Sequence, residues 1–279
     1  MYRNPSTRIV VDELKSLVRR DYVDIPEGQM HYRQAGSGDR TVLLLHMIMS
    51  SGDEYTRMMV LLKDKYRLFA PDHLGQGESV VPPRQYDIPD YARSMISFMD
   101  ALGIKKAVVL GHHGSAQIAA EMAAFHPDRV EALILSGIPC PDNPEVELAK
   151  SKLPEMQPIE IKWDGSHLWE YWERANRFGE SVQVCNERAL DYFKGGPKGE
   201  EMHHASFRYA VHIKETLGQV KCPTLLICGR KDWLSPGSFV AQKILGCELV
   251  FIEPGSVVMN REMPERVVAA FLPFLQSLK

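Results

Sequence analysis

The chain has 279 residues, of which 44% are hydrophobic, enough for one large α/β domain or two small ones with a buried core. Its 33 basic and 36 acidic residues give a formal charge of −3, which favours neither nucleic acid nor an anionic membrane as a partner. Its five scattered cysteines form neither a recognisable disulfide framework nor a CxxC metal motif.

The longest apolar run in the first 22 residues is Ile9–Val11, which is too short for the core of a secretory signal. No apolar stretch elsewhere approaches the roughly 20 residues of a membrane span. We therefore expect a cytoplasmic protein without a membrane partner, present as a monomer or a homodimer.

The predicted elements begin with a hairpin, in which Tyr22–Ile25 and Gln29–Gln34 flank a turn at Pro26–Gly28. Short, continuous apolar runs follow, as expected for parallel strands that are buried on both faces. Longer amphipathic segments alternate with these runs, which predicts a doubly wound sheet flanked by helices. The predicted strands are Thr41–His46, Tyr66–Pro71, Ala107–Gly111, Ala132–Ser136, Thr224–Cys228 and Glu248–Ile252, and the predicted helices are Asp53–Lys63, Ile88–Leu102, Ser115–Phe125, Gly237–Ile244 and Pro264–Leu278.

Residues 141–219 interrupt this alternation, because they contain helix-like segments but no convincing buried strand. They follow the sixth strand, and we expect them to form a helical cap over the carboxyl edge of the sheet, where ligands bind in such folds. The predicted core then consists of residues 1–140 and 220–279, and the predicted cap of residues 141–219.

Five motifs occur along these elements in a fixed order. They are His46 at a strand end, Asp72-His-Leu-Gly75-Gln-Gly77-Glu-Ser79 after the next strand, Gly111-His-His113-Gly-Ser115 at a strand-to-helix turn, His126-Pro127-Asp128-Arg129-Val130 at a helix end, and Gly229-Arg-Lys-Asp232 after a later strand. Their order and context resemble the α/β-hydrolase superfamily over nearly the whole chain. The resemblance implies a mostly parallel eight-stranded sheet, a nucleophile elbow centred on residue 113, and Asp232 as the triad acid.

The elbow departs from that pattern, because His113 stands where the superfamily has serine, cysteine or aspartate. Ser115 replaces the second elbow glycine, and Met47 replaces the glycine that usually follows His46. The position expected for the triad histidine holds Val257, or Val258 with a shift of one residue. A Ser–His–Asp proton relay is therefore excluded, and only its acid remains.

The elbow turns its central side chain into the pocket, so we expect the ring of His113 to approach Asp232 directly or through one water. Asp232 favours the imidazolium, whereas the N-terminus of the following helix disfavours it, so we expect a pKa near the ordinary value of about 6.5. Such a ring suits a general base that activates water or abstracts a carbon-bound proton. A covalent imidazole intermediate is the alternative.

Residues expected around His113 complete the predicted site. The N–H groups of Ile48 and Gly114 are the expected oxyanion-hole donors. Met47 is expected to form part of an apolar wall beside them. Trp169 and Trp172 share one face of a predicted cap helix, which either roofs the pocket or packs within the cap. No metal ligands are expected, and the histidines at 203, 204 and 212 lack partners at a recognised metal-binding spacing.

The sequence therefore predicts a cofactor-free enzyme that acts on a small, largely apolar carbonyl or ester-type substrate. Hydrolysis is the expected reaction, although fold alone does not determine chemistry. Two alternatives remain open. One is a lyase, isomerase or decarboxylase in which His113 moves a single proton. The other is a non-catalytic small-molecule-binding protein, since receptors of this superfamily carry an aliphatic residue in place of the triad histidine.

Overall fold

The structure is a computed structural model that describes residues 17–150, 152, 157–176, 181–196 and 199–279. The expectation about a signal segment falls largely on residues 1–16, which lie outside the described residues. Among the described helices, none combines the length and apolar character needed to cross a bilayer.

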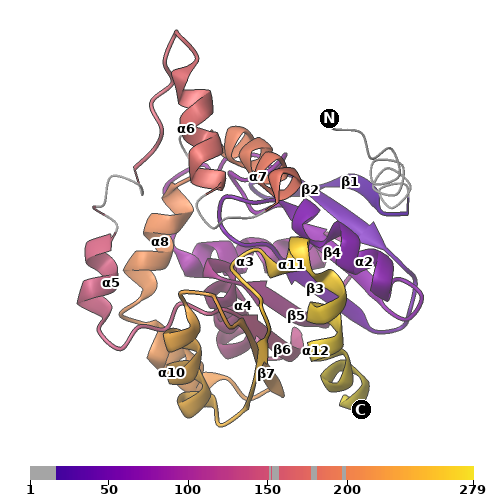
Figure 1. Cartoon of the computed structure of the whole chain (residues 1–279). Coiled ribbons are helices and arrows are strands. Elements are labelled where there is room, and N and C mark those ends of the chain that lie inside the picture. Colours follow the sequence, from indigo (N-terminus) through magenta and orange to yellow (C-terminus); the bar gives the residue numbers. More distant parts are fainter. Residues whose placement is uncertain (1–16, 151, 153–156, 177–180, 197–198) are drawn as a thin grey trace.

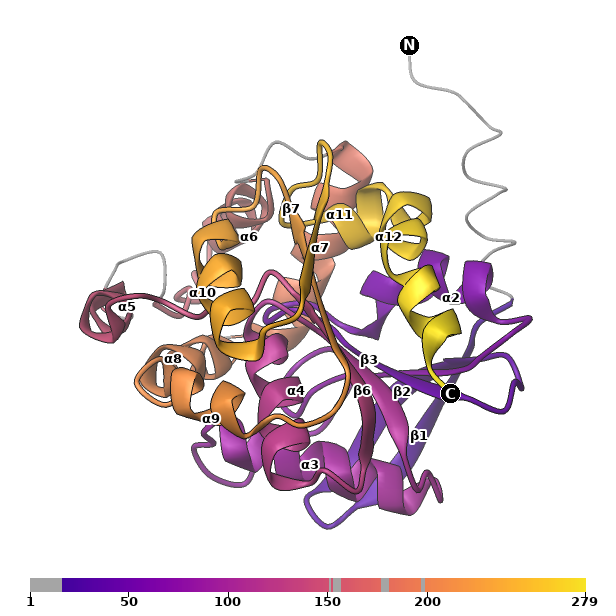
Figure 2. The same cartoon turned by 90° about the horizontal axis from the view of Figure 1, so that it is seen from below.

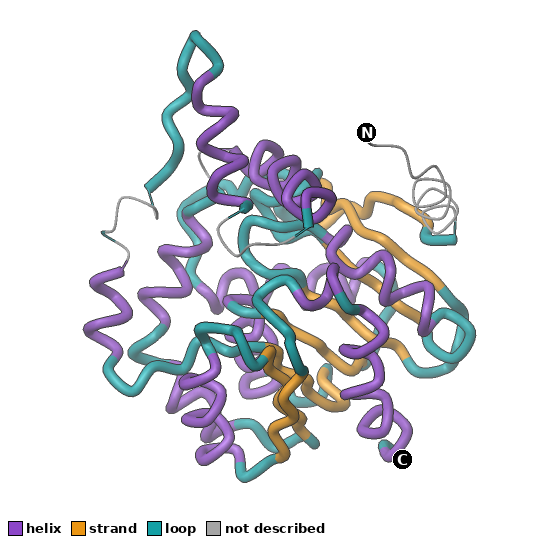
Figure 3. Tube along the Cα trace, in the orientation of Figure 1, coloured by secondary structure: helices purple, strands orange, loops and turns teal. Residues whose placement is uncertain are grey.

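Eight strands form one sheet at the centre of the molecule (Figures 1 and 3). The first two strands form the predicted antiparallel hairpin, and β2 also pairs antiparallel with β4. All later pairings are parallel, so the expected eight-stranded, mostly parallel sheet is confirmed. In the spatial order β1-β2-β4-β3-β5-β6-β7-β8, the strands are β1 Arg19–Ile25, β2 Gly28–Ala35, β4 Arg67–Pro71, β3 Thr41–Leu45, β5 Ala107–His112, β6 Val130–Ser136, β7 Thr224–Gly229 and β8 Glu248–Ile252.

Each central strand is buried on both faces, which explains its continuous apolar sequence. In β3, for example, Leu43 and Leu45 join one hydrophobic cluster, whereas Val42 and Leu44 join the cluster on the opposite face. Figure 2 shows the two helical layers that cover these faces. One layer contains α3 (Ile88–Ala101), α4 (Gly114–Phe125) and α10 (Ser235–Leu245), and the other contains α2 (Thr56–Leu62) and α12 (Pro264–Ser277).

Two local features differ from the predicted helices. The segment predicted as one helix over 53–63 begins with a 3₁₀ turn, η1 (Gly52–Tyr55), before α2 starts. Ser51 caps this turn, because its hydroxyl accepts a hydrogen bond from the N–H of Asp53. A short helix that the sequence analysis missed, α11 (Met259–Glu262), precedes α12.

Between β6 and β7 the described residues form helices and connecting turns, without a strand. These insertion helices are α5 (Pro144–Lys150), α6 (Ser166–Ala175), α7 (Val182–Gly195), α8 (Glu201–Tyr209) and α9 (Ile213–Gln219). Figure 1 shows α6 and α7 above α3, α4 and α10. Side chains of α6, α7 and α8 line a pocket together with His113.

Candidate active site

The turn between β5 and α4 has the backbone geometry of a nucleophile elbow. His113 adopts φ 53° and ψ −125°, a positive φ that is uncommon for any residue other than glycine. Its N–H donates to the carbonyl of Ser136 at 2.8 Å, which ties the turn to β6. A Cβ at Gly111 would lie 2.4 Å from the carbonyl oxygen of Ser115, so the strand and helix can cross this closely only over glycine. The predicted strained elbow is therefore confirmed.

The ring of His113 lies directly against the acid predicted from the superfamily pattern. Its Nε2 is 2.7 Å from Oδ2 of Asp232, and both side chains are buried. The second carboxylate oxygen, Oδ1, accepts a hydrogen bond from the N–H of Leu234 at 2.9 Å. Gly137, at the end of β6, makes room for the pair, because a Cβ there would lie 2.7 Å from Oδ2 and 2.9 Å from the His113 ring. The ring of His113 and the carboxylate of Asp232 are therefore in direct contact.

Burial and the contact between the two side chains together determine the charge states of His113 and Asp232. Burial lowers the pKa of His113 below the ordinary value of 6.5, against the opposing effect of Asp232, and the neighbouring His112 lowers it further. Burial alone would raise the pKa of Asp232, but the interaction with His113 and the N–H of Leu234 hold it below its ordinary value. The expectation of a nearly unshifted His113 is thus corrected, because desolvation outweighs the carboxylate.

These charge states fix the tautomer of the neutral ring. An ionised Asp232 only accepts hydrogen bonds, so Nε2 of His113 carries the proton and donates a hydrogen bond to the carboxylate. Nδ1 then has the lone pair, and it forms no hydrogen bond with any residue that the structure describes. Nε2 therefore holds the ring against Asp232, and Nδ1 is the nitrogen that can accept a proton.

His113 lines a pocket of about 90 Å³ between the sheet and the insertion helices. This volume is well below the roughly 300–1,000 Å³ of sites for drug-sized ligands, so the pocket suits a small molecule. The described lining consists of Met47, Ile48, His113, Gly114, Pro139, Arg174, Arg188, Tyr192, His203, Ser206, Phe207, Trp233, Leu234 and Val257.

The predicted oxyanion-hole residues both line this pocket. No described residue accepts a hydrogen bond from the N–H of Ile48 or of Gly114, as expected for a loop and for the first turn of a helix. The Ile48 side chain packs over Gly114, where a Cβ would lie 2.2 Å from its Cδ1. The oxyanion role of the two groups remains a prediction.

Met47 and Val257 meet at one wall of the pocket. They share a small hydrophobic cluster with Val184 and Val258. Val257, at the position where the superfamily pattern expects a histidine, thus lines the same pocket as His113. The Met47 N–H donates to Oε2 of Glu54 at 3.0 Å, and the positive φ in this loop occurs at Met49.

The two predicted cap tryptophans lie outside the pocket lining. Trp169 and Trp172 stack on each other with ring centroids 5.2 Å apart, and Trp169 is 61% exposed. The aromatic residue that does line the pocket beside His113 is Trp233, whose ring meets the imidazole edge-on at 6.0 Å. The shared helical face of Trp169 and Trp172 was predicted correctly, but the sequence does not reveal that these side chains lie outside the pocket lining.

A buried hydrogen-bond network involves His112, the residue that precedes His113 at the elbow. Nδ1 of His112 is 2.6 Å from Oε1 of Glu54, which also accepts from the side-chain amide of Asn260 at 2.7 Å. Burial would raise the pKa of Glu54, but the charge and hydrogen bond of His112 lower it well below its ordinary value. Because Glu54 also holds the Met47 N–H, this carboxylate connects the elbow to the predicted oxyanion loop.

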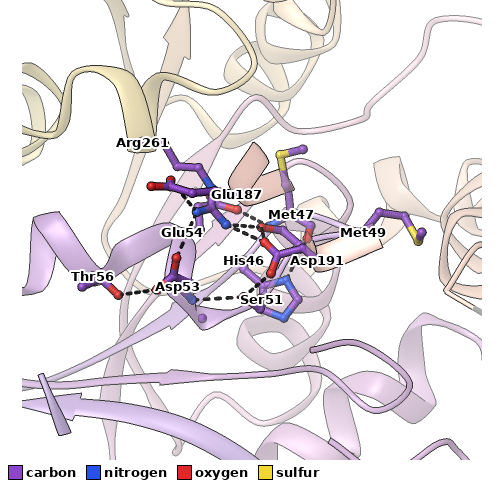
Figure 4. Close-up of polar contacts among 12 residues, drawn as sticks. His46, Met47, Met49, Ser51, Asp53, Glu54, Thr56, Glu187, Asp191 and Arg261 are labelled. Carbon is purple, nitrogen blue, oxygen red and sulfur yellow. Dashed lines mark hydrogen bonds and ion pairs between the residues drawn. The ribbon is translucent and has the colours of Figure 1, made fainter. Parts of the chain in front are cut away.

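A buried cluster of ionic groups joins this loop to α7 (Figure 4). Arg261 on α11 lies 2.6 Å from Asp191, 3.1 Å from Glu187 and 3.3 Å from Asp53, and only 4% of its surface is exposed. Asp191 accepts hydrogen bonds from Ser50 and Ser51. The cluster therefore fixes one face of α7 against the core.

His112, His113 and Asp232 each offer an atom within 4.8 Å of the others, which is the spacing of a candidate metal site. Two ligands about 2.1 Å from a tetrahedral zinc lie roughly 3.4 Å apart. The 2.7 Å between Nε2 of His113 and Oδ2 of Asp232 is shorter and typical of a hydrogen bond. The geometry therefore fits a hydrogen-bonded pair better than two ligands of one ion.

Several lining residues were not identified from the sequence. Trp233 could have been identified, because it directly follows Asp232, the acid that the motif already placed at the site. Gly137 does not line the pocket, but it directly follows the predicted strand Ala132–Ser136 and makes room for the pair of His113 and Asp232. Arg174 and Arg188 gave no signal, because charged residues on amphipathic helices usually face solvent.

Known proteins share this fold. Residues 40–158 match the family described as alpha/beta hydrolase fold. Bifunctional epoxide hydrolase 2 of Rattus norvegicus is 33% identical over 134 residues, which make up 46% of this chain but only 24% of that protein. Serine hydrolase BPHL of Homo sapiens is 27% identical over 237 residues, or 81% of this chain and 76% of that protein. An esterase structure from Thermogutta terrifontis superposes with a TM-score of 0.78 at 21% identity, covering 93% of this chain and 99% of that one. The predicted α/β-hydrolase fold is confirmed.

Proposed function

We propose that this chain, which has the α/β-hydrolase fold, is a cofactor-independent hydrolase of small esters or lactones in which His113 is the general base. The observation that carries this proposal is the 2.7 Å contact between Nε2 of His113 and Oδ2 of Asp232, made from a strained elbow that lines a pocket. The proposal includes a helical cap over residues 141–219 and a cytoplasmic location.

The reaction follows from the tautomer of His113. Asp232 accepts a hydrogen bond from the Nε2–H group and orients the ring. Nδ1 takes a proton from a water molecule as the oxygen of that water bonds to the carbonyl carbon of the substrate. Charge that develops on the carbonyl oxygen is stabilised by the N–H groups of Ile48 and Gly114. When the carbon–oxygen bond to the leaving group breaks, the leaving alkoxide takes the proton from Nδ1. No covalent enzyme intermediate forms.

The serines near His113 are engaged elsewhere, which supports attack by water. The Ser115 hydroxyl donates to the carbonyl of His46 at 2.5 Å and lies 2.8 Å from Nε2 of His73. The Ser206 hydroxyl lines the pocket but donates to the side-chain carbonyl of Gln117 at 2.7 Å. Val257 also provides no base that would activate a serine.

The names of the relatives agree with hydrolysis as the reaction class. The epoxide hydrolase and the serine hydrolase are named for reactions in which water is a reactant. Those activities are the activities of those proteins. In this chain, His113 occupies the nucleophile position, so the mechanism we propose does not use a serine.

Serine-directed fluorophosphonates distinguish the two mechanisms. We expect the wild-type protein to hydrolyse members of a panel of small esters and lactones, and to keep its rate after treatment with a fluorophosphonate. Intact-mass measurement should show no stoichiometric adduct. The double variant His113→Ser with Val257→His, treated in parallel, is the matched control, because it combines a serine at the elbow with a base that could activate it. Stoichiometric labelling of Ser115 or Ser206 with loss of rate in the wild type would refute the proposed base.

A further inference from the structure

A second cavity lies where α8 and α9 pack beside α3 and α4 (Figure 2). Its volume is about 530 Å³, which falls within the roughly 300–1,000 Å³ typical of sites for small ligands. It shares no described lining residue with the pocket that contains His113. The cavity is therefore a separate candidate site, which the reaction proposed above does not use.

Glu121 on α4 brings a buried carboxylate to this cavity. Only 8% of the residue is exposed, and it forms no ion pair with any residue that the structure describes. Its Oε2 accepts a hydrogen bond from the Tyr209 hydroxyl, whereas Oε1 has no hydrogen-bond partner among the described residues. Burial raises the pKa of this carboxyl, against the hydrogen bond from Tyr209 and the charges of His126 and Arg93. A buried carboxylate oxygen that lacks a donor favours a positively charged ligand.

Two hydroxyl groups fix the orientation of the Glu121 carboxylate. An ionised carboxylate only accepts hydrogen bonds, so the single hydroxyl proton of Tyr209 points at Glu121. The Oγ1 of Thr216 lies 2.6 Å from the Tyr209 oxygen, so Thr216 supplies the proton of that second contact. Both hydroxyl protons therefore point along the chain toward Glu121, and neither is available to its Oε1.

The charges around the cavity also favour a cation. Its described lining includes three carboxylates, those of Asp87, Glu121 and Glu215, and one guanidinium, that of Arg208. With histidine counted as neutral, these groups leave a formal charge of −2. Arg208 is paired with Asp87, because its Nε donates to Oδ1 at 2.7 Å. The excess negative charge therefore lies on Glu121 and Glu215, and it attracts cationic ligands.

An exposed aromatic ring lies beside the buried carboxylate. Phe125 lines the same cavity and is 58% exposed. It follows Glu121 by four positions on α4, so the two side chains share one helical face, with their Cβ atoms about 6 Å apart. One small ligand can therefore place a cationic group at Glu121 and an apolar group against the ring of Phe125.

We propose that this cavity binds a primary ammonium compound with an apolar group a few bonds from its nitrogen. The ammonium donates to Oε1 of Glu121, and the apolar group packs on Phe125. An arylalkylamine has both features at the required spacing. This site does not depend on the reaction at His113, because the two cavities share no described lining residue.

Two matched probes test the site by binding alone. The 2-phenylethylammonium ion carries the cation, and 2-phenylethanol replaces it with a neutral hydroxyl of similar size. Titration calorimetry at neutral pH should show that the ammonium binds roughly 10- to 100-fold more tightly, as expected for a charge-assisted hydrogen bond to a buried carboxylate. This preference should be lost in Glu121→Gln, whose amide oxygen can still accept from Tyr209. Phe125→Ala should weaken the binding of both probes.

Glu215→Gln is the matched control, because Glu215 lines the same cavity but is exposed. We expect this variant to keep most of the preference, since water screens an exposed charge. Thermal unfolding of each variant identifies any that does not fold, and the wild-type comparison needs no variant. Equal binding of the two probes by the wild type, or binding of neither, would overturn the proposed site. A preference that survives Glu121→Gln would also overturn it, because the ammonium would then bind elsewhere.

Discussion

Replacing His113 with alanine should lower kcat/KM for the best ester or lactone by roughly 100- to 10,000-fold, the usual contribution of a positioned general base. The loss should appear mainly in kcat, because the ring acts on the proton transfer and the pocket walls still bind the substrate. Steady-state kinetics of the purified variant measures it directly.

Asp232→Asn is the companion to that experiment. Its amide keeps the shape of the carboxylate but presents a different hydrogen-bonding pattern to Nε2 of His113, so the ring loses its preferred tautomer. We expect a fall in kcat with little change in thermal stability. Full activity in His113→Ala would remove His113 from the reaction and favour the interpretation of this protein as a ligand-binding module.

Replacing Arg261 with methionine should lower the free energy of unfolding by about 3–5 kcal/mol, as is typical when one partner of a buried ionic group is removed. Burial lowers the pKa of Arg261, but Asp191 and its acidic neighbours raise it above its ordinary value, so the guanidinium is charged in the fold. Its loss would leave Asp191 buried without this counter-charge, and burial already raises the pKa of that carboxyl. Urea unfolding at neutral pH measures the change.

Arg57→Met provides the control for this cluster. Arg57 pairs with the same Glu187 at 2.7 Å, but its side chain is 23% exposed, so water can take over part of its role. Its loss should therefore cost much less than the loss of Arg261. Equal effects of the two substitutions would show that the buried cluster does not hold α7 to the core as described.

The sheet was predictable because its strands are buried on both faces. The predicted range Glu248–Ile252 coincides with β8, and the strands at the centre of the sheet differ by one or two residues at an end. The elbow was also predictable, because a tight turn between a strand and a helix directs its central side chain into the pocket. The approach of His113 to Asp232 followed from ring length and the position of the acid loop.

The insertion helices carried the features that the sequence did not reveal. A shared face for Trp169 and Trp172 follows from helical spacing, but which way that face points depends on distant packing. The position of Arg188 in the pocket lining depends likewise on how α7 packs on the core, where Glu187 and Asp191 contact Arg261. The pKa of His113 was placed too high because the depth of burial is a property of the assembled fold.

The protonation of His113 measured alongside the rate tests the central claim most directly. In protein labelled with ¹⁵N-histidine, NMR should show Nε2 protonated and Nδ1 unprotonated at pH 7, with the ring taking up a second proton below pH 6.5. A protonated ring cannot accept a proton from water, so kcat/KM should rise with pH through the same transition and then level off. A rate that stays constant while His113 titrates, or a proton on Nδ1 at neutral pH, would contradict the account.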